Sequence, residues 1–184
     1  QFYGATYLLD QIGDKLGIVD DLKASFPDRY KQLLSLAYFF VLEEGMSAYR
    51  LRKWALTHKH SYGRDIPSQQ ISDLMGSIDE ASKMNFFRRQ AKRRAEKEYL
   101  AFDTTSISSY SELIKLAKYG KNKEGDHLPQ VNLALLYGEV SRLPVYFRKL
   151  TGNTADVSLI RNLMLDIDFL DMKKLSFVMG RSFY

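Results

Sequence analysis

The spacing of apolar residues changes near Tyr99, and this change constrains the fold of the 184-residue chain more than any other feature. Before this point apolar side chains recur every three or four residues, which is typical of amphipathic helices. After it they alternate along short runs, which is typical of half-buried strands. The sequence therefore predicts an α+β protein, with an all-helical region over residues 1–98 and a mixed β-sheet over residues 99–184.

Helices account for the whole of the first region in this interpretation. The strongest helix is expected to open at Pro27, because proline needs no hydrogen-bond partner in a first turn, and to end at Gly45, which suits a left-handed cap. Asp79 is expected to cap the last helix, which runs to about Glu98. The other predicted helices cover residues 5–16, residues 48–58 after Ser47, and residues 68–75.

Strands and a single helix account for the second region. Strands are predicted over residues 99–105, 130–137, 144–150 and 175–179, and a helix over residues 155–170 lies between the last two of them. A turn over Glu139 to Leu143 joins the second and third strands. This order predicts an antiparallel meander, followed by a crossover helix and a return strand in the same mixed sheet.

Composition narrows the class of protein. The 27 Lys and Arg residues exceed the 22 Asp and Glu residues, and a net charge of +5 weakly favours a polyanionic partner such as DNA. The chain has no cysteine, which excludes disulfides, cysteine–zinc sites and thiol catalysis and is consistent with a cytoplasmic location. No run approaches the roughly 18–20 apolar residues of a membrane span, so no membrane partner is expected.

Asp103 is the residue with the clearest chemical interest. It lies in the middle of the first predicted strand, after Phe102 and before Thr104. Aspartate is rare inside strands because its side chain is costly to bury and competes for backbone hydrogen bonds. Two interpretations remain equal on the residues alone: a carboxylate kept for a partner or metal, and an edge-strand Asp bonded to Thr104 or Ser106.

Five segments resemble conserved motifs of insertion-sequence DDE transposases, in the same order. Residues 101–111 (AFDTTSISSYS) resemble the first acidic motif, and residues 119–133 (YGKNKEGDHLPQVNL) resemble the second strand with its preceding loop. Residues 143–148 (LPVYFR) and 152–156 (GNTAD) resemble the third strand and the turn after it, and residues 177–184 (FVMGRSFY) resemble the fourth strand.

This resemblance implies a ribonuclease-H-like sheet and a site for Mg²⁺ or Mn²⁺. In the family, Asp residues on the first and fourth strands and a later Glu hold two divalent ions that act on a phosphodiester. Asp103 matches the first of these ligands, whereas Gly180 stands where the family has the second Asp, and Tyr184 precedes any segment that supplies the Glu. We therefore expect a fragment or degenerate copy of a DNA transposase that binds no metal tightly and does not cut DNA.

Two other interpretations remain open. One is a non-catalytic remnant that binds DNA, and a weaker one is a purely structural helical protein. A core that lacks its later part is expected to leave a sheet edge uncovered, which favours self-association.

Two segments are candidates for DNA contact. A basic stretch over Lys83–Lys97 carries its cations on the outward face of the last helix, with Arg88, Arg89, Lys92 and Arg93 as candidate phosphate ligands. A solvated helix face is the alternative. Gln69 and Gln70 resemble the start of a recognition helix, with residues 47–57 as a rival segment, although ordinary packing helices are favoured for both.

Other polar residues receive structural interpretations. His58 and His60 are expected at the start of a polar loop, because their spacing is too close for two metal ligands on one helix face and no third ligand is evident. Asp166, Asp168 and Asp171 are expected as solvated acids near the end of a helix.

Overall fold

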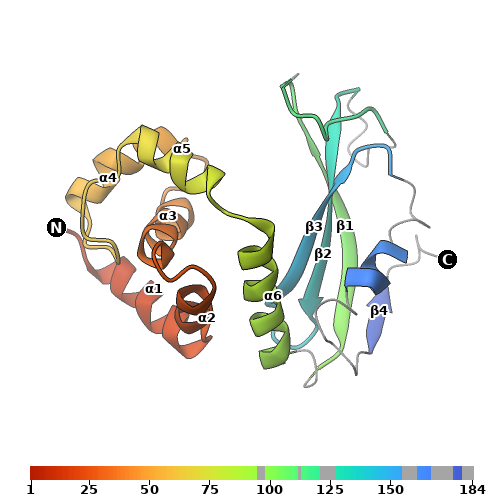
Figure 1. The fold of residues 1–184 in the computed structure, drawn as a ribbon, viewed down its shortest axis with the longest axis horizontal. Helices are drawn as coiled ribbons and strands as arrows, with labels where there is room; N and C mark the ends of the chain where they lie inside the picture. The colour runs from red at the N-terminus through yellow and green to blue at the C-terminus, as the bar shows by residue number, and fades with distance from the viewer. Residues whose placement is uncertain (95–97, 112, 121–126, 155–160, 167–175, 180–184) are drawn as a thin grey trace. The chain divides into compact units, whose positions relative to one another are not determined.

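The computed structural model describes residues 1–94, 98–111, 113–120, 127–154, 161–166 and 176–179 (Figure 1). The chain divides into two compact units, Gln1–Gln90 and Ala91–Tyr184, which we call the helical unit and the sheet unit. The fold is α+β, with helices first and strands after them. The division falls inside the last helix of the first region, whereas the sequence suggested a boundary after residue 98.

Helices make up the first part of the chain. Their bounds are α1 Gly4–Lys15, α2 Ile18–Ser25, α3 Tyr30–Leu42, the 3₁₀ helix η1 Ala48–Arg50, α4 Leu51–Thr57, α5 Ser68–Gly76 and α6 Glu80–Arg94. Buried apolar side chains from α3, α4, α5 and the segment before α5 form one cluster: Leu34, Leu36, Tyr38, Phe39, Leu51, Trp54, Ala55, Ile66, Ile71 and Leu74. This cluster is the core of the helical unit.

The helix ends correct three details of the sequence prediction. Gly17 has a φ of 70° and reverses the chain after α1, so a separate α2 forms where none was predicted. Pro27 lies in a turn, and α3 begins at Tyr30. Gly45 has the expected left-handed φ of 75°, but α3 already ends at Leu42. The Asp79 cap is confirmed, because Oδ1 of Asp79 accepts the N–H of Ser82 at 2.8 Å.

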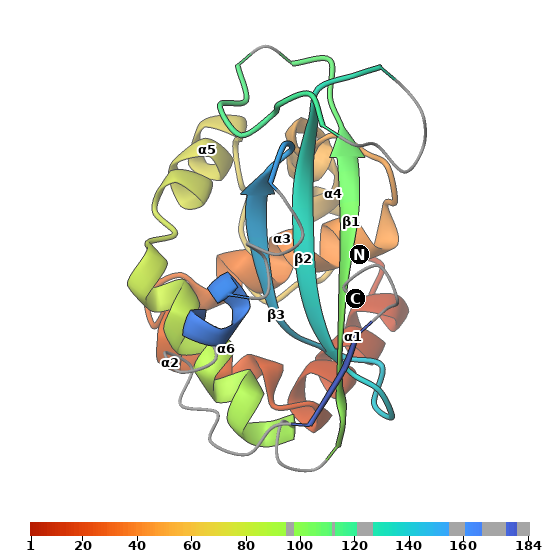
Figure 2. The ribbon, with the colours of Figure 1, turned by 90° about the vertical axis from the view of Figure 1, so that its right-hand side faces the viewer.

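Four strands form a single described sheet in the order β3-β2-β1-β4 (Figure 2). Their bounds are β1 Leu100–Ser108, β2 Gln130–Gly138, β3 Pro144–Thr151 and β4 Phe177–Met179. β1 pairs with β2 and β2 with β3 in antiparallel fashion, whereas β4 pairs with β1 in parallel. Residues 161–166, between β3 and β4, are helical. The predicted meander, helix and return strand are therefore confirmed for the described residues.

The two faces of the sheet differ. Phe102, Leu136 and Tyr146 are buried and follow one another across β1, β2 and β3, and the short helix 161–166 lies over this face (Figure 2). Leu163 of that helix is buried. Asp103 follows Phe102 and therefore projects from the opposite face, since successive side chains of a strand alternate.

At the end of the sheet where β2 begins and β3 ends, the backbone of Gly152 lies close to neighbouring backbone segments. Gly152 donates its N–H to the carbonyl oxygen of Leu116, and its own carbonyl oxygen accepts the side-chain amide of buried Gln130 at 3.1 Å. A Cβ atom at Gly152 would overlap the carbonyl oxygens of Gln130 and Lys118. The glycine of the GNTAD segment thus has a packing role, which its sequence neighbourhood did not predict.

None of the described helices is both long enough and apolar enough to cross a bilayer.

Candidate functional site

Asp103 lies on β1, which has β2 on one side and β4 on the other and is therefore not an edge strand of the described sheet. The described pairing with β4 covers only Leu100, Ala101 and Phe102, so Asp103 is paired with Leu135 of β2 and directly follows the last residue paired with β4. The exposed carboxylate accepts the backbone N–H of Thr104 at 2.8 Å, which is the local bond that the structural interpretation expected. A carboxylate in this position faces solvent from the middle of a rigid sheet.

The parallel pairing brings β4 to the same level as the start of β1. Leu100 lies beside Phe177, Ala101 beside Val178 and Phe102 beside Met179. Asp103 is the residue after Phe102, and Gly180, which follows Met179 in the sequence, lies outside the described residues.

The donor set does not fit a two-metal centre. Within the part of the chain that the structure describes, no three His, Asp or Glu side chains are placed to hold an ion. Glycine at position 180 contributes no side-chain oxygen wherever it lies. Divalent Mg²⁺ keeps its own waters unless carboxylates and substrate oxygens replace them, so one carboxylate is a poor site.

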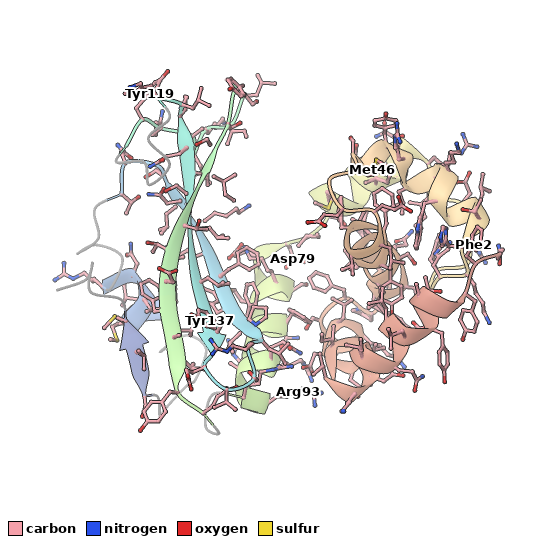
Figure 3. All side chains as sticks on the ribbon, turned by 180° about the vertical axis from the view of Figure 1, so that it is seen from behind. Phe2, Met46, Asp79, Arg93, Tyr119 and Tyr137 are labelled. Carbon is pink, nitrogen blue, oxygen red and sulfur yellow. The ribbon has the colours of Figure 1, made fainter. Side chains whose placement is uncertain are left out.

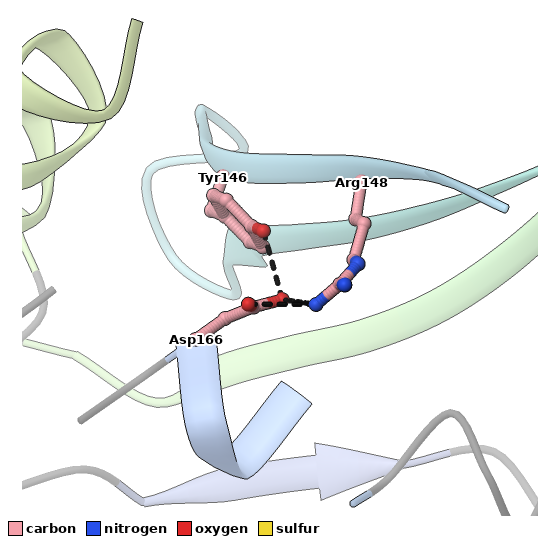
Figure 4. Close-up of polar contacts among 3 residues, drawn as sticks. All are labelled: Tyr146, Arg148 and Asp166. Carbon is pink, nitrogen blue, oxygen red and sulfur yellow. Dashed lines mark hydrogen bonds and ion pairs between the residues drawn. The ribbon is translucent and has the colours of Figure 1, made fainter. Parts of the chain in front are cut away.

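Asp166 is not the solvated acid that the sequence suggested. Its side chain is 16% exposed and lies 2.7 Å from Nη1 of Arg148, and it accepts the hydroxyl of Tyr146 at 2.8 Å (Figure 4). These bonds join helix 161–166 to β3, and the adjoining cavity of about 10 Å³ leaves no room for a ligand. The group is therefore structural. Asp168 and Asp171 lie outside the described residues.

Glu98 holds the turn between β2 and β3. Its Oε2 accepts the backbone N–H groups of Val140 and Ser141, each at 2.8 Å. Burial acts to raise the pKa of Glu98, but bonds from Ser141 and Val140 and the charge of Arg94 outweigh it and lower this pKa. The sequence suggested that Glu98 ends a helix, and this role was not predictable from local pattern because the partner residues lie more than 40 positions later.

The basic helix is only partly as predicted. Arg89, Lys92 and Arg93 are exposed and Arg88 is half-buried, but Arg94 is 7% exposed and so is not on the outward face. Figure 3 labels Asp79 just before α6 and Arg93 near its other end. The helix therefore offers a smaller cationic face than its composition suggested.

The glutamines of α5 are exposed, as expected of contact residues. Gln69 donates its side-chain amide to Asp73 at 2.9 Å, and Gln70 lies beside it. Residues 58–67 separate α5 from α4, whereas a helix-turn-helix joins its helices through three or four residues. The pair α4 and α5 is therefore not a compact helix-turn-helix.

The two histidines follow α4, where His60 is buried and His58 is half-buried, so neither is a fully solvated loop residue. His60 is 9% exposed and its Nδ1 lies 2.9 Å from the hydroxyl oxygen of Ser35. Burial lowers the pKa of His60. His58 stacks on Trp54 with ring centroids 4.7 Å apart and planes 12° from parallel. The signal for this contact in the sequence was the four-residue spacing between Trp54 and His58.

No protein-family model, curated protein or solved structure matches this chain.

Proposed function

We propose that the chain is a piece or degenerate copy of a DDE transposase, the parent of which cuts and joins DNA with Mg²⁺ or Mn²⁺. The single observation that carries the proposal is the parallel pairing of β1 with β4, with Phe102 beside Met179. The family resemblance implies acidic ligands on these two strands, and Asp103 and position 180 each follow a member of this pair. An exposed carboxylate on an interior strand supports the same interpretation.

We propose that the present chain is catalytically inactive. Two divalent ions need several oxygen ligands to clamp the attacking and leaving oxygens of a phosphodiester. Gly180 removes one of the carboxylates that the resemblance implies. No step of DNA cleavage is therefore assigned to these residues.

A plasmid assay tests this part of the proposal. Purified chain is incubated with supercoiled plasmid and Mg²⁺ or Mn²⁺, beside an Asp103→Ala control. We expect equal and negligible nicking for both proteins. Nicking by the wild-type chain that disappears in Asp103→Ala would contradict the proposal that the chain is catalytically inactive.

DNA binding is the activity that we propose the chain retains, through α6. Arg89 and Lys92 are exposed on this helix, and each phosphate that a cation neutralises adds about 0.9 to the slope of log affinity against log salt. We expect Arg89→Gln and Lys92→Gln each to weaken binding to duplex DNA and to reduce this slope by about one. The matched control is Lys23→Gln, an exposed cation of α2.

The DNA-binding assay separates the structural interpretation from the two interpretations in which the chain binds DNA. Salt-dependent binding with no nicking fits either the degenerate transposase or a remnant that serves only to bind DNA. A chain that binds no DNA at low salt would leave only the structural interpretation.

A further inference from the structure

A pocket of about 230 Å³ lies in the helical unit, between the end of α3 and one side of α4. We call it the α4 pocket, and the residues that define it here are Glu43, Met46, Arg50, Lys53, Trp54 and His58. Met46, labelled in Figure 3, comes from the segment between α3 and η1. None of the proposed metal or α6 residues contributes to this pocket.

The inner wall of the α4 pocket is aromatic and apolar. Trp54 is 4% exposed and is fixed by its stack on His58 and by an edge contact to Phe39, whose ring centroid lies 5.9 Å away. Met46 adds a polarizable thioether that is 39% exposed. The ring of His58, which is half-buried and backed by Trp54, and the adaptable side chain of Met46 suit a flat ring system.

The rim of the pocket carries more positive than negative charge. Arg50 and Lys53 are three residues apart, at the spacing that places side chains on the same side of a helix, and both are exposed. Among the described residues, the guanidinium of Arg50 has two weak partners, the hydroxyl of Tyr49 at 3.4 Å and the sulfur of Met46 at 3.5 Å. Glu43 is the single acid that lines the pocket.

We propose that the α4 pocket binds a nucleotide unit, with its base against the apolar wall and its phosphate between Arg50 and Lys53. A pocket of 230 Å³ lies below the range of about 300–1,000 Å³ for drug-sized ligands, so it suits one small ring system. Aromatic walls bind bases through their π faces, and arginine and lysine bind phosphate. The unit comes either from a free nucleotide or from an unpaired position in DNA.

Trp54 makes the proposal directly measurable, because it is the only tryptophan of the chain. Titration with dAMP is expected to change its fluorescence, whereas deoxyadenosine, which lacks the phosphate, binds at least tenfold more weakly. A DNA hairpin with one unpaired adenine is compared with a fully paired hairpin of the same length. A change with the unpaired base alone identifies DNA as the source, and a change with dAMP identifies a free nucleotide. No change with either ligand overturns the proposal.

Charge variants sharpen the test. Arg50→Gln and Lys53→Gln are expected to weaken binding at least tenfold, while Glu43→Gln strengthens it because it removes a repulsive charge. Arg64→Gln, which changes an exposed cation outside the pocket, serves as the control. Helical circular dichroism verifies that each variant is folded. Equal affinities for all four variants and the wild type would overturn the proposal, and this outcome is independent of the plasmid assay because Asp103 is not involved.

Discussion

The helical unit and the sheet unit both bury apolar side chains, and both carry polar bonds between residues distant in the sequence, such as the buried bond from Gln90 to Asp21 in the helical unit. In the helical unit, one apolar cluster around Leu51 and Trp54 accounts for the core. In the sheet unit, strand pairing is supplemented by polar groups from distant positions, such as Asp166 on Arg148 and Glu98 on the turn at Val140. The comparison shows that the spacing of apolar residues in the sequence predicts a core. Stabilising polar contacts cannot be predicted in this way, because their partners lie far apart in the sequence.

The largest expected effects come from removing fully buried leucines, one in each unit. Leu51 and Leu136 are both 0% exposed, and Leu→Ala changes at such sites cost about 2–5 kcal/mol. Urea unfolding is followed by Trp54 fluorescence, which reports the helical unit, and by far-ultraviolet circular dichroism. We expect Leu51→Ala to shift the fluorescence midpoint more than Leu136→Ala does. Equal fluorescence shifts for both variants would contradict the separation into two units.

A glycine substitution tests the close backbone contact of Gly152 at the end of the sheet where β2 begins and β3 ends. Gly152→Ala forces a Cβ atom into the carbonyl oxygens of Gln130 and Lys118, and overpacking of this kind costs about 1–3 kcal/mol. Gly76→Ala is the control, because no described atom beyond its chain neighbours and the backbone of its own helix lies within 4 Å of the added Cβ. Thermal unfolding of the two variants gives the comparison. A Gly152→Ala protein as stable as the Gly76→Ala protein would contradict the close approach.

Glu98 gives a smaller effect that depends on pH. Glu98→Gln retains an acceptor but loses the charge, and we expect a loss of up to about 1 kcal/mol at neutral pH. The folded-state pKa of Glu98 is lowered from its ordinary value of 4.5, so its contribution is present above about pH 4.5 and is lost as the pH falls through the folded-state pKa. Unfolding free energies measured from pH 7 to pH 3 should therefore converge for wild type and variant. A constant difference over this range would contradict the role of the charge.

His60 gives the smallest effect, at a different pH. Burial lowers its folded-state pKa from the ordinary value of 6.5. Below pH 6.5 the unfolded chain binds a proton that folded His60 does not, so stability falls as the pH decreases from this value. Fluorescence-detected unfolding at pH 7.5 and pH 5.5 measures the loss, and His60→Gln is expected to reduce it. An unchanged loss in that variant would assign the effect to other groups.

Much of the fold followed from the sequence, and the reasons for the misses are physical. Short apolar runs predicted the four strands and their order along the chain, and alternation was clearest in the run that forms β2. Pro27 misled the helix assignment, because a proline also suits the turn before a helix. Helix α2 was missed because no pattern in the sequence marked Gly17 as the residue before a new helix. Asp166 and Glu98 were misjudged, because their partners Arg148 and Val140 lie far along the chain and no local pattern marks them.

The candidate site was predictable only in part. The mid-strand position of Asp103 drew attention to it because aspartate is rare there, but the residues alone did not decide between an interior and an edge strand. The parallel register of β1 and β4 supplied that information. The α4 pocket was not predicted, since it joins the end of α3 to α4 through side chains that each resembled ordinary surface or core residues.

The most direct test of the central claim is a Mn²⁺ titration, followed by electron paramagnetic resonance of the free ion. Gly180→Asp returns a carboxylate to the residue after Met179, and two neighbouring carboxylates can share a divalent ion. The account predicts that Gly180→Asp binds Mn²⁺ at least tenfold more tightly than the wild-type chain, and that adding Asp103→Ala abolishes the gain. A Gly180→Asp protein with no gain, or a gain that survives Asp103→Ala, would contradict the account.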